Sequence, residues 1–304
     1  MDTLLIVDGH ALIHRAYHAL PAFKTKDGVP TNALYGFVTM LDTAIKEFRA
    51  THVVVCLDTP AKTFRDELFP DYRAHRPQVD QDLIKQFPMV TDFLRASHIT
   101  FVEQEGYEAD DLIATIATTF KEDSIVKLIL TGDKDIMQLV NAKHRIMVIA
   151  PQNGNKTPLM YDEDAVIKRF HIRPDQIADY KALAGDPSDN YKGVGGIGPK
   201  TATDLISKFG SVEDIYEHIE EVENLNVKEK LKVDKENALM SKKLAQLVYI
   251  VPVDVDLEKL KFSGYNEELK NFFDEYQFRS LKRRFFNEPL KGDAKEKKNQ
   301  LGLF

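Results

Sequence analysis

Three short apolar runs in the first half of the chain each end at an aspartate, and this pattern constrains the fold most strongly. The runs are LLIVD, ending at Asp8, VVVCLD, ending at Asp58, and LILTGD, ending at Asp133. The helical patterns between such runs predict an α/β fold with a mostly parallel central sheet and helices on both faces. Ligands bind these sheets beyond the carboxyl ends of the strands, so we expect the aspartates to share one site. The predicted strands are residues 4–7, 52–57, 99–102, 125–130 and 146–149.

Further carboxylates gather at helix starts and turns, which brings the total to nine acids in five groups. Each acid taken alone is typical of a helix cap or a turn, but caps need only one residue each. Crowded carboxylates raise one another's pKa unless cations neutralise them, and oxygen ligands without His or Cys favour Mg²⁺ or Mn²⁺ over zinc. Two such ions assist in-line displacement at phosphodiesters, so the sequence predicts metal-dependent phosphate chemistry. The nine acids are Asp8, Asp58, Glu108, Asp110, Asp111, Asp133, Asp135, Asp186 and Asp189.

A glycine-rich segment in the helical second half predicts a contact with a nucleic-acid backbone. It is GVGGIGPKTATDLISKFG at residues 193–210. Gly196 and Gly198 allow a phosphate to approach closely, Lys200 adds a cation, and a helix opens at Thr201. We expect a helix-hairpin-helix element here, with a glycine-rich turn that binds nothing as the alternative.

A second basic segment, residues 62–77, interleaves cations with aromatic residues. Lys62 and Arg65 stand close to Phe64 and Phe69 in KTFRDELFPDYRAHRP. This mixture suits single-stranded nucleic acid, where cations meet phosphates and rings stack on bases. A solvated helix with core aromatics explains the segment equally well.

Composition excludes several classes of protein. The single cysteine, Cys56, allows no internal disulfide and indicates a reducing compartment, here the cytoplasm. The longest apolar run, residues 53–57, is far short of the roughly 20 residues that span a bilayer, and the N-terminus has no signal-peptide pattern. We expect neither a membrane protein nor a secreted one. The net charge of −7 does not exclude nucleic acid, because a total hides where the basic residues lie.

Six motifs occur along the chain: VDGHALIHRAYHA, KTFRDELFPDYRAHRP, EGYEADD, TGDKDIMQLV, GDPSDN and GVGGIGPKTA. Their order is the one found in bacterial 5′ nucleases. Over residues 1–287 the chain resembles the 5′–3′ exonuclease domain of bacterial DNA polymerase I and the stand-alone flap endonucleases. The resemblance implies a PIN-like α/β nuclease core at 1–160 with a helical arch at 60–97, a helical DNA-binding region at 161–290 with the hairpin at 190–210, and a flexible tail at 291–304.

The resemblance also implies an activity. It is that of a Mg²⁺-dependent nuclease, monomeric and at the nucleoid, that cuts 5′ flaps, nicks and RNA primers in Okazaki-fragment maturation and repair. If the chain is the full product, the nuclease stands alone. A non-catalytic module that binds DNA junctions is the alternative, and a PIN-type ribonuclease is a third hypothesis that gives no reason for the arch and the hairpin.

Residue roles follow from the matched motifs. The resemblance implies a first metal among Asp8, Asp58, Glu108, Asp110 and Asp111, and a second among Asp133, Asp135, Asp186 and Asp189. It implies catalytic roles for Arg73, Arg76, Asp111 and Asp133, DNA contacts at Arg15, Tyr72, Arg73 and Arg76 beside Lys62 and Arg65, and a K⁺ ion at the hairpin carbonyls. Arg73 departs from the lysine usual in the family, and it keeps the charge but presents it as a rigid fork.

The last five residues, QLGLF, resemble the pentapeptide that docks bacterial proteins on the replicative sliding clamp. The matching positions are Gln300, Leu301, Leu303 and Phe304, whereas Gly302 departs from the pattern. Exposed apolar residues on a polar linker indicate binding to an apolar pocket of a partner protein. A frayed tail that binds nothing is the alternative.

Overall fold

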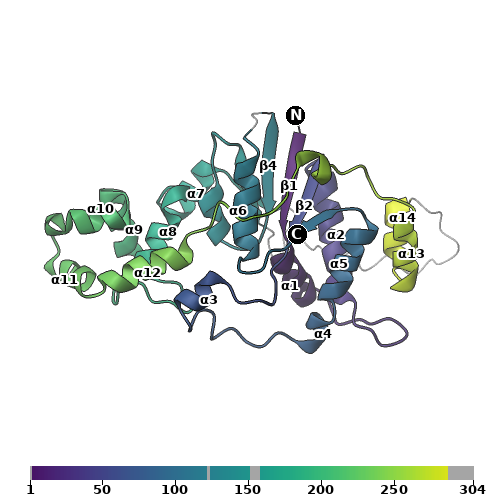
Figure 1. Ribbon diagram of the computed structural model, residues 1–304, viewed down its shortest axis with the longest axis horizontal. Helices are drawn as coiled ribbons and strands as arrows, with labels where there is room; N and C mark the ends of the chain where they lie inside the picture. Colours follow the sequence, from purple (N-terminus) through teal and green to yellow (C-terminus); the bar gives the residue numbers. More distant parts are fainter. Residues whose placement is uncertain (1, 122–123, 151–157, 287–304) are drawn as a thin grey trace.

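A six-stranded sheet lies at the centre of the computed structural model, which describes residues 2–121, 124–150 and 158–286 (Figure 1). The strand order is β3-β2-β1-β4-β5-β6, with β1 to β5 parallel and β6 antiparallel to β5. The mostly parallel sheet is confirmed, but β6 was not predicted because its three residues carry no periodic signal. The strands are β1 (Asp2–Asp8), β2 (His52–Cys56), β3 (Thr100–Val102), β4 (Ile125–Leu130), β5 (Ile146–Ala150) and β6 (Leu159–Tyr161).

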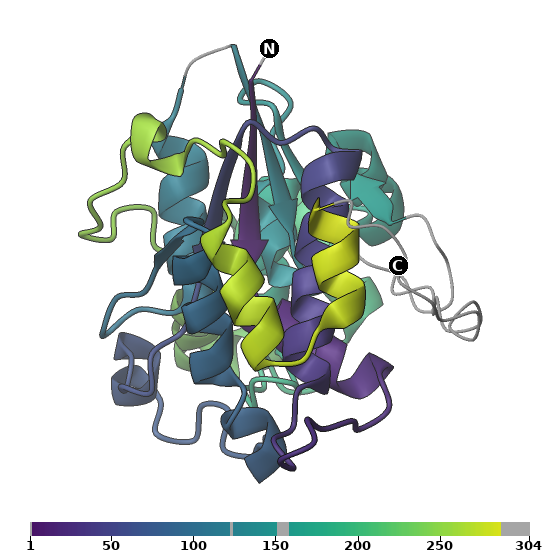
Figure 2. The ribbon, with the colours of Figure 1, turned by 90° about the vertical axis from the view of Figure 1, so that its right-hand side faces the viewer.

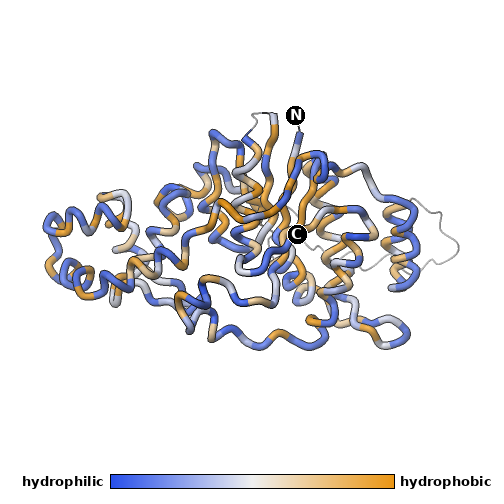
Figure 3. The backbone as a smooth tube through the Cα atoms, viewed as in Figure 1, coloured by the Kyte–Doolittle hydropathy of each residue, from blue (hydrophilic) through white to orange (hydrophobic). Residues whose placement is uncertain are grey.

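Each face of the sheet packs against its own core of helices, because successive strand side chains point to opposite faces. Leu4 and Ile6 of β1 lie in a core with α6 (Ala109–Thr119), whereas Leu5 and Val7 lie in a core with α1 (Gly9–Ala19) and α2 (Asn32–Glu47). Figure 3 shows hydrophobic residues concentrated in the central strands. Full burial of such a side chain contributes about 1.5–3 kcal/mol, so β1 is fixed in its register.

A helical region extends beyond α6 at one end of the molecule (Figure 1). In the hairpin segment α9 begins after Gly198 with a proline at its first position, where no backbone N–H is needed, and ends at Gly210, whose φ is 99°. Helix α8 packs against both α9 and α12. The helices of this region are α7 (Glu163–Phe170), α8 (Ile177–Ala184), α9 (Pro199–Phe209), α10 (Val212–Glu217), α11 (Leu225–Val233) and α12 (Lys235–Ala245), with short 3₁₀ turns η2 (Pro174–Gln176) and η3 (Ile219–Glu221).

The expected helical region at 161–290 is not one unit. After η4 (Leu257–Leu260) the chain returns to the α/β core, where α13 (Glu268–Glu275) and α14 (Arg279–Phe286) lie beside α5 (Phe87–Ala96) and α2 (Figure 2). The physical reason is burial of apolar side chains: Phe273 and Leu281 are each 1% exposed in the core that also contains Leu5 and Val7 of β1. The expected tail at 291–304, with its QLGLF motif, lies outside the described residues.

The expected helical arch at 60–97 is also smaller than predicted. Helix α5 (Phe87–Ala96) belongs to the core, since Val90 and Phe93 are fully buried. The rest of the segment contains the short helices α3 (Phe64–Leu68) and α4 (Gln81–Ile84), and it runs from beside the helical region to below α5 (Figure 1). Helix α4 also contributes to the core through Leu83, which is 1% exposed. Across the described part of the chain, no helix is both long and apolar enough to cross a membrane.

Candidate metal centre

A first group of carboxylates forms where β1 and β2 end and α6 begins. Asp8 caps α1, since its Oδ1 accepts the Ala11 N–H at 3.0 Å, and its Oδ2 accepts the Thr131 hydroxyl at 2.6 Å. Asp58 Oδ1 accepts the Ala109 N–H at 2.7 Å. The last of these bonds holds Asp58 at the start of α6, where Glu108 and Asp110 lie.

The first group is short of counter-charge. Burial, with smaller contributions from Asp58 and Asp133, raises the pKa of Asp8 to about 6. Burial also raises the pKa of Glu108 to about 7, although Arg65 and Arg73 oppose the shift, and it raises the pKa of Asp110 well above its usual range together with Asp133 and Asp8. A bound divalent cation would relieve this repulsion.

A second group lies at the start of the 3₁₀ turn η1 (Asp135–Leu139) and in the loop after α8. One carboxylate oxygen each from Asp135, Asp186 and Asp189 lies within 4.8 Å of the others. Lys181 of α8 forms ion pairs with both Asp135 and Asp186. Burial would lower the pKa of Lys181, but the two carboxylates raise it above its usual value, so its ammonium stays charged between them.

The two groups adjoin each other. Asp133 Oδ1 accepts the Asp135 N–H at 2.9 Å, which ties the end of β4 to the second group. Arg73 bridges them, since it lies 3.0 Å from Glu108 Oε1 and 3.1 Å from Asp189 Oδ1. The eight acids other than Asp111 therefore form a single anionic centre, as the strand-end pattern predicted for three of them.

The segment between α3 and α4 is held over this centre. Its backbone is anchored where the Arg73 N–H donates to the Asp189 carbonyl at 3.1 Å, and Arg73 takes a left-handed φ of 56°. Arg76 Nη2 lies 2.7 Å from Asp189 Oδ1, and the buried Tyr72 hydroxyl donates to Asp189 Oδ2 at 3.2 Å. Three residues expected at DNA thus contact the acids directly.

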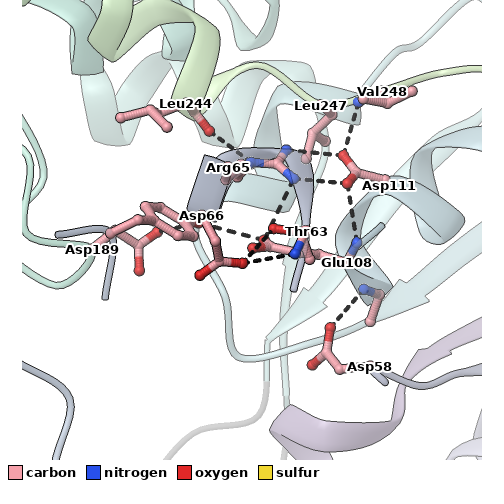
Figure 4. Close-up of polar contacts among 12 residues, drawn as sticks. Asp58, Thr63, Arg65, Asp66, Glu108, Asp111, Asp189, Leu244, Leu247 and Val248 are labelled. Atoms are coloured by element: carbon pink, nitrogen blue, oxygen red, sulfur yellow. Dashed lines mark hydrogen bonds and ion pairs between the residues drawn. The ribbon is translucent and has the colours of Figure 1, made fainter. Parts of the chain in front are cut away.

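Arg65 and Asp111 have a different role from the one expected. Arg65, 2% exposed, forms a bidentate pair with Asp111, 0% exposed, at 2.7 and 2.9 Å (Figure 4). The remaining Arg65 donors reach the carbonyls of Leu244 and Gln246, and Asp111 Oδ1 also accepts the Val248 N–H at 2.9 Å. All of these groups are satisfied within the protein, so the geometry supports neither a DNA contact by Arg65 nor a metal-binding or catalytic role for Asp111. The pair joins α3 and α6 to the end of α12.

The hairpin residues lie at the surface. Gly196, Gly198 and Lys200 are exposed, and Thr201 is half-buried in the first turn of α9. Lys230 of α11 donates to the Gly196 carbonyl at 3.1 Å, a contact that sequence reasoning missed because it joins residues far apart in the chain. Of the other expected DNA contacts, Lys62 is exposed, and Arg15 on α1 has a buried Nε without a hydrogen-bond partner in the described structure.

Sequence reasoning also missed two residues of the second group. Lys181 precedes Asp186 by five residues, so the helix before the GDPSDN turn carries a cation back to the acids that follow it. Tyr191 directly follows the turn and exchanges two backbone hydrogen bonds with Asp186, at 2.8 and 3.1 Å. Both residues could have been suspected from the sequence, because they stand close to the GDPSDN turn that carries Asp186 and Asp189.

Solved structures share this fold. The T5 D15 protein co-crystallised with metal ions has a TM-score of 0.66 at 22% identity, over 80% of this chain and 89% of that one. The catalytic core of Rad2 in complex with DNA substrate has a TM-score of 0.60 at 18% identity, over 93% of this chain and 91% of that one. These likenesses concern the fold alone.

Sequence relatives are closer. The 5′-3′ exonuclease of Aquifex aeolicus is 38% identical over 282 residues, which cover 92% of this chain and 94% of that protein. DNA polymerase I of Bacillus caldotenax is also 38% identical, over 91% of this chain, which spans only 32% of the polymerase. Residues 3–171 match the 5′-3′ exonuclease, N-terminal resolvase-like domain, and residues 172–268 match the 5′-3′ exonuclease, C-terminal SAM fold. The chain belongs to the 5′–3′ exonuclease family.

Proposed function

We propose that the chain is a structure-specific 5′ nuclease, a 5′–3′ exonuclease and flap endonuclease that hydrolyses DNA phosphodiesters with two Mg²⁺ ions, for which Mn²⁺ can substitute. One observation carries the proposal: two carboxylate groups adjoin at the carboxyl edge of the sheet, and a basic segment lies directly over them. The substrates would be 5′ flaps, nicks and RNA primers in replication and repair.

The residues present fit divalent cations. The donors are all oxygens, and the protein already places Lys181, Arg73 and Arg76 against the same carboxylates. The first cation would be held among Asp8, Asp58, Glu108 and Asp110, and the second among Asp133, Asp135, Asp186 and Asp189. When bound, two such ions lower the pKa of the attacking water and stabilise the leaving oxygen.

The arginines over the centre have a further role in this proposal. If Glu108 and Asp189 were neutralised, the guanidinium groups of Arg73 and Arg76 would be available to the phosphate next to the scissile bond. Arg76 is 50% exposed and Arg73 is 25% exposed, so both are within reach of a strand that passes under the segment. A planar guanidinium suits two phosphate oxygens, which supports a role for Arg73 in place of a lysine.

The hairpin would hold duplex DNA by its backbone. Exposed glycine amides at the start of α9 and the ammonium of Lys200 supply donors that are independent of base sequence. The K⁺ ion expected at the hairpin would need carbonyls other than that of Gly196, which already accepts from Lys230. Docking of residues 300–304 on a sliding clamp and action as a monomer also stay proposals.

Cleavage of a labelled double-flap DNA tests the function. Wild-type protein should cut near the flap junction with Mg²⁺ or Mn²⁺ and not with EDTA. Asp133→Asn should lose cutting but keep binding the junction, whereas Glu275→Gln on α13, at the far end of the molecule, should cut normally. Junction binding without cutting by the wild-type protein under every metal condition would favour the non-catalytic module instead.

A further inference from the structure

Tyr191 carries a buried hydroxyl that no group satisfies. The residue is 3% exposed, and its Oη has no hydrogen-bond partner within the described residues. Buried polar groups are nearly always hydrogen-bonded, to protein or to water, because an unmade bond costs free energy. The hydroxyl therefore needs a partner that the described residues do not supply.

The position of the ring is fixed by the loop that carries two of the acids. Backbone hydrogen bonds of 2.8 and 3.1 Å between Asp186 and Tyr191 close the loop that holds Asp186 and Asp189. The Tyr191 ring packs with Tyr72, Leu244 and Ala245 in a small apolar cluster. The backbone bonds and the apolar cluster thus fix the position of the ring.

Tyr191 lies beside the second carboxylate group, since its backbone pairs with that of Asp186 and it stands two residues after Asp189. Burial raises the pKa of Tyr191 above its usual value, and the carboxylates of Asp135, Asp186 and Asp189 raise it further. The carboxylates nevertheless have other partners: Lys181 contacts Asp135 and Asp186, and Ser188 Oγ donates to Asp186 Oδ1 at 2.6 Å. Tyr72 offers a contrast from the same cluster, because its hydroxyl reaches Asp189 directly at 3.2 Å.

We propose that Tyr191 is a positioning residue for the cation that Asp135, Asp186 and Asp189 would hold, and that its hydroxyl would hydrogen-bond a water of that cation. Mg²⁺ in proteins keeps several of its waters and takes only one or two carboxylates directly, so groups that hold those waters affect its affinity. Hydrogen-bonding groups around a metal's ligands change affinity by about 10–100-fold when removed. The proposal rests on the proposed two-cation function and deepens it at one site.

Tyr191→Phe tests the proposal, because it removes one oxygen and keeps the ring packing. Mn²⁺ binding to the protein without DNA, followed by calorimetry, should become about 10-fold weaker at one site. Thermal stability in EDTA should be unchanged or higher, since the lost hydroxyl had no partner. Tyr216→Phe is the matched control: its hydroxyl donates to the Leu231 carbonyl at 3.1 Å, so stability should fall while Mn²⁺ affinity stays the same.

Terbium luminescence gives a second measurement that does not depend on cleavage. The chain has 11 tyrosines and no tryptophan, so a nearby tyrosine must sensitise any bound Tb³⁺. Tyr191→Phe should reduce the sensitised emission at saturating Tb³⁺, whereas Tyr216→Phe should not.

The outcomes separate the two proposals. Equal Mn²⁺ affinity, within twofold, in wild-type protein and Tyr191→Phe would overturn the role of Tyr191 and leave the nuclease proposal standing. A loss of stability in EDTA with unchanged affinity would show that the hydroxyl serves the fold, which also overturns the role. Absence of Mn²⁺ binding by the wild-type protein would contradict both proposals.

Discussion

Replacing Lys181 with methionine should destabilise the metal-free protein and make its stability depend strongly on Mg²⁺. The Lys181 side chain is 13% exposed and pairs with Asp135 and Asp186, whose side chains are 16% and 9% exposed. Removal of one partner from a buried ion pair costs about 3–5 kcal/mol, because the remaining charge stays buried without compensation. Lys181→Met leaves two such carboxylates, so we expect a loss in this range in EDTA.

Magnesium should restore most of the lost stability. A ligand that binds only the folded state stabilises it by about 2.7 kcal/mol at 100 times its dissociation constant. In the wild-type protein the ion must compete with the Lys181 ammonium, whereas in Lys181→Met it meets uncompensated carboxylates. The stability difference between the two proteins should therefore shrink by at least half when Mg²⁺ is added.

Urea unfolding of both proteins, in EDTA and in saturating Mg²⁺, measures these quantities. Lys259→Met is the control, since Lys259 pairs with Asp254 at an exposed site and its loss should change little in either buffer. A Lys181→Met difference that is the same with and without Mg²⁺, or is below about 1 kcal/mol in EDTA, would refute the reasoning.

Four further predictions follow from the same contacts. Arg65→Met should lower the free energy of urea unfolding by about 3–5 kcal/mol, since it leaves the buried Asp111 carboxylate without its ion-pair partner. A loss of DNA affinity at unchanged stability would contradict the structural role of Arg65. In metal-free protein, Asp8, Glu108 and Asp135 have folded pKa values of about 6, 7 and 6, above their unfolded values, so their contribution to stability should be lost as the pH rises from about 4 to about 7. Melting temperatures in EDTA that rise over this range would contradict the prediction. Lys200→Ala should weaken binding to duplexes of every sequence, and it should lower the slope of log binding constant against log salt concentration by about 1, as measured by fluorescence anisotropy. An unchanged slope would exclude a contact between Lys200 and a phosphate. Phe273→Ala should lower the free energy of unfolding by about 3–5 kcal/mol through loss of core volume, while Mg²⁺-dependent cleavage by the folded fraction persists. A change in stability near zero, as expected of an exposed residue, would contradict the packing of α13 in the core.

Local pattern predicted the parts of the fold that depend on neighbouring residues. Apolar strands that end at Asp8, Asp58 and Asp133 indicated both the parallel sheet and the edge where the acids meet. The start of a helix at residues 198–201 could also be predicted, because Gly198 and Pro199 are residue types typical of a helix N-terminus.

Long-range partners were not predictable in the same way. By residue type and sequence context, Arg65 could contact nucleic acid and Asp111 could bind a metal. Only the tertiary fold shows that the two side chains form an ion pair with each other. The return of α13 and α14 to the sheet also depends on packing between distant segments, for example the 2.8 Å ion pair of Arg284 with Asp42. A periodic pattern shows that a helix is amphipathic but not which surface it covers.

Location of bound cations tests the central claim most directly. Crystals soaked in Mn²⁺ and measured at the manganese absorption edge should show one anomalous peak among Asp8, Asp58, Glu108 and Asp110, and another among Asp135, Asp186 and Asp189. With the second site filled, Lys181 should have moved away from Asp135 and Asp186. Peaks absent from both carboxylate groups, with Lys181 still between its two aspartates at saturating Mn²⁺, would contradict the two-cation account.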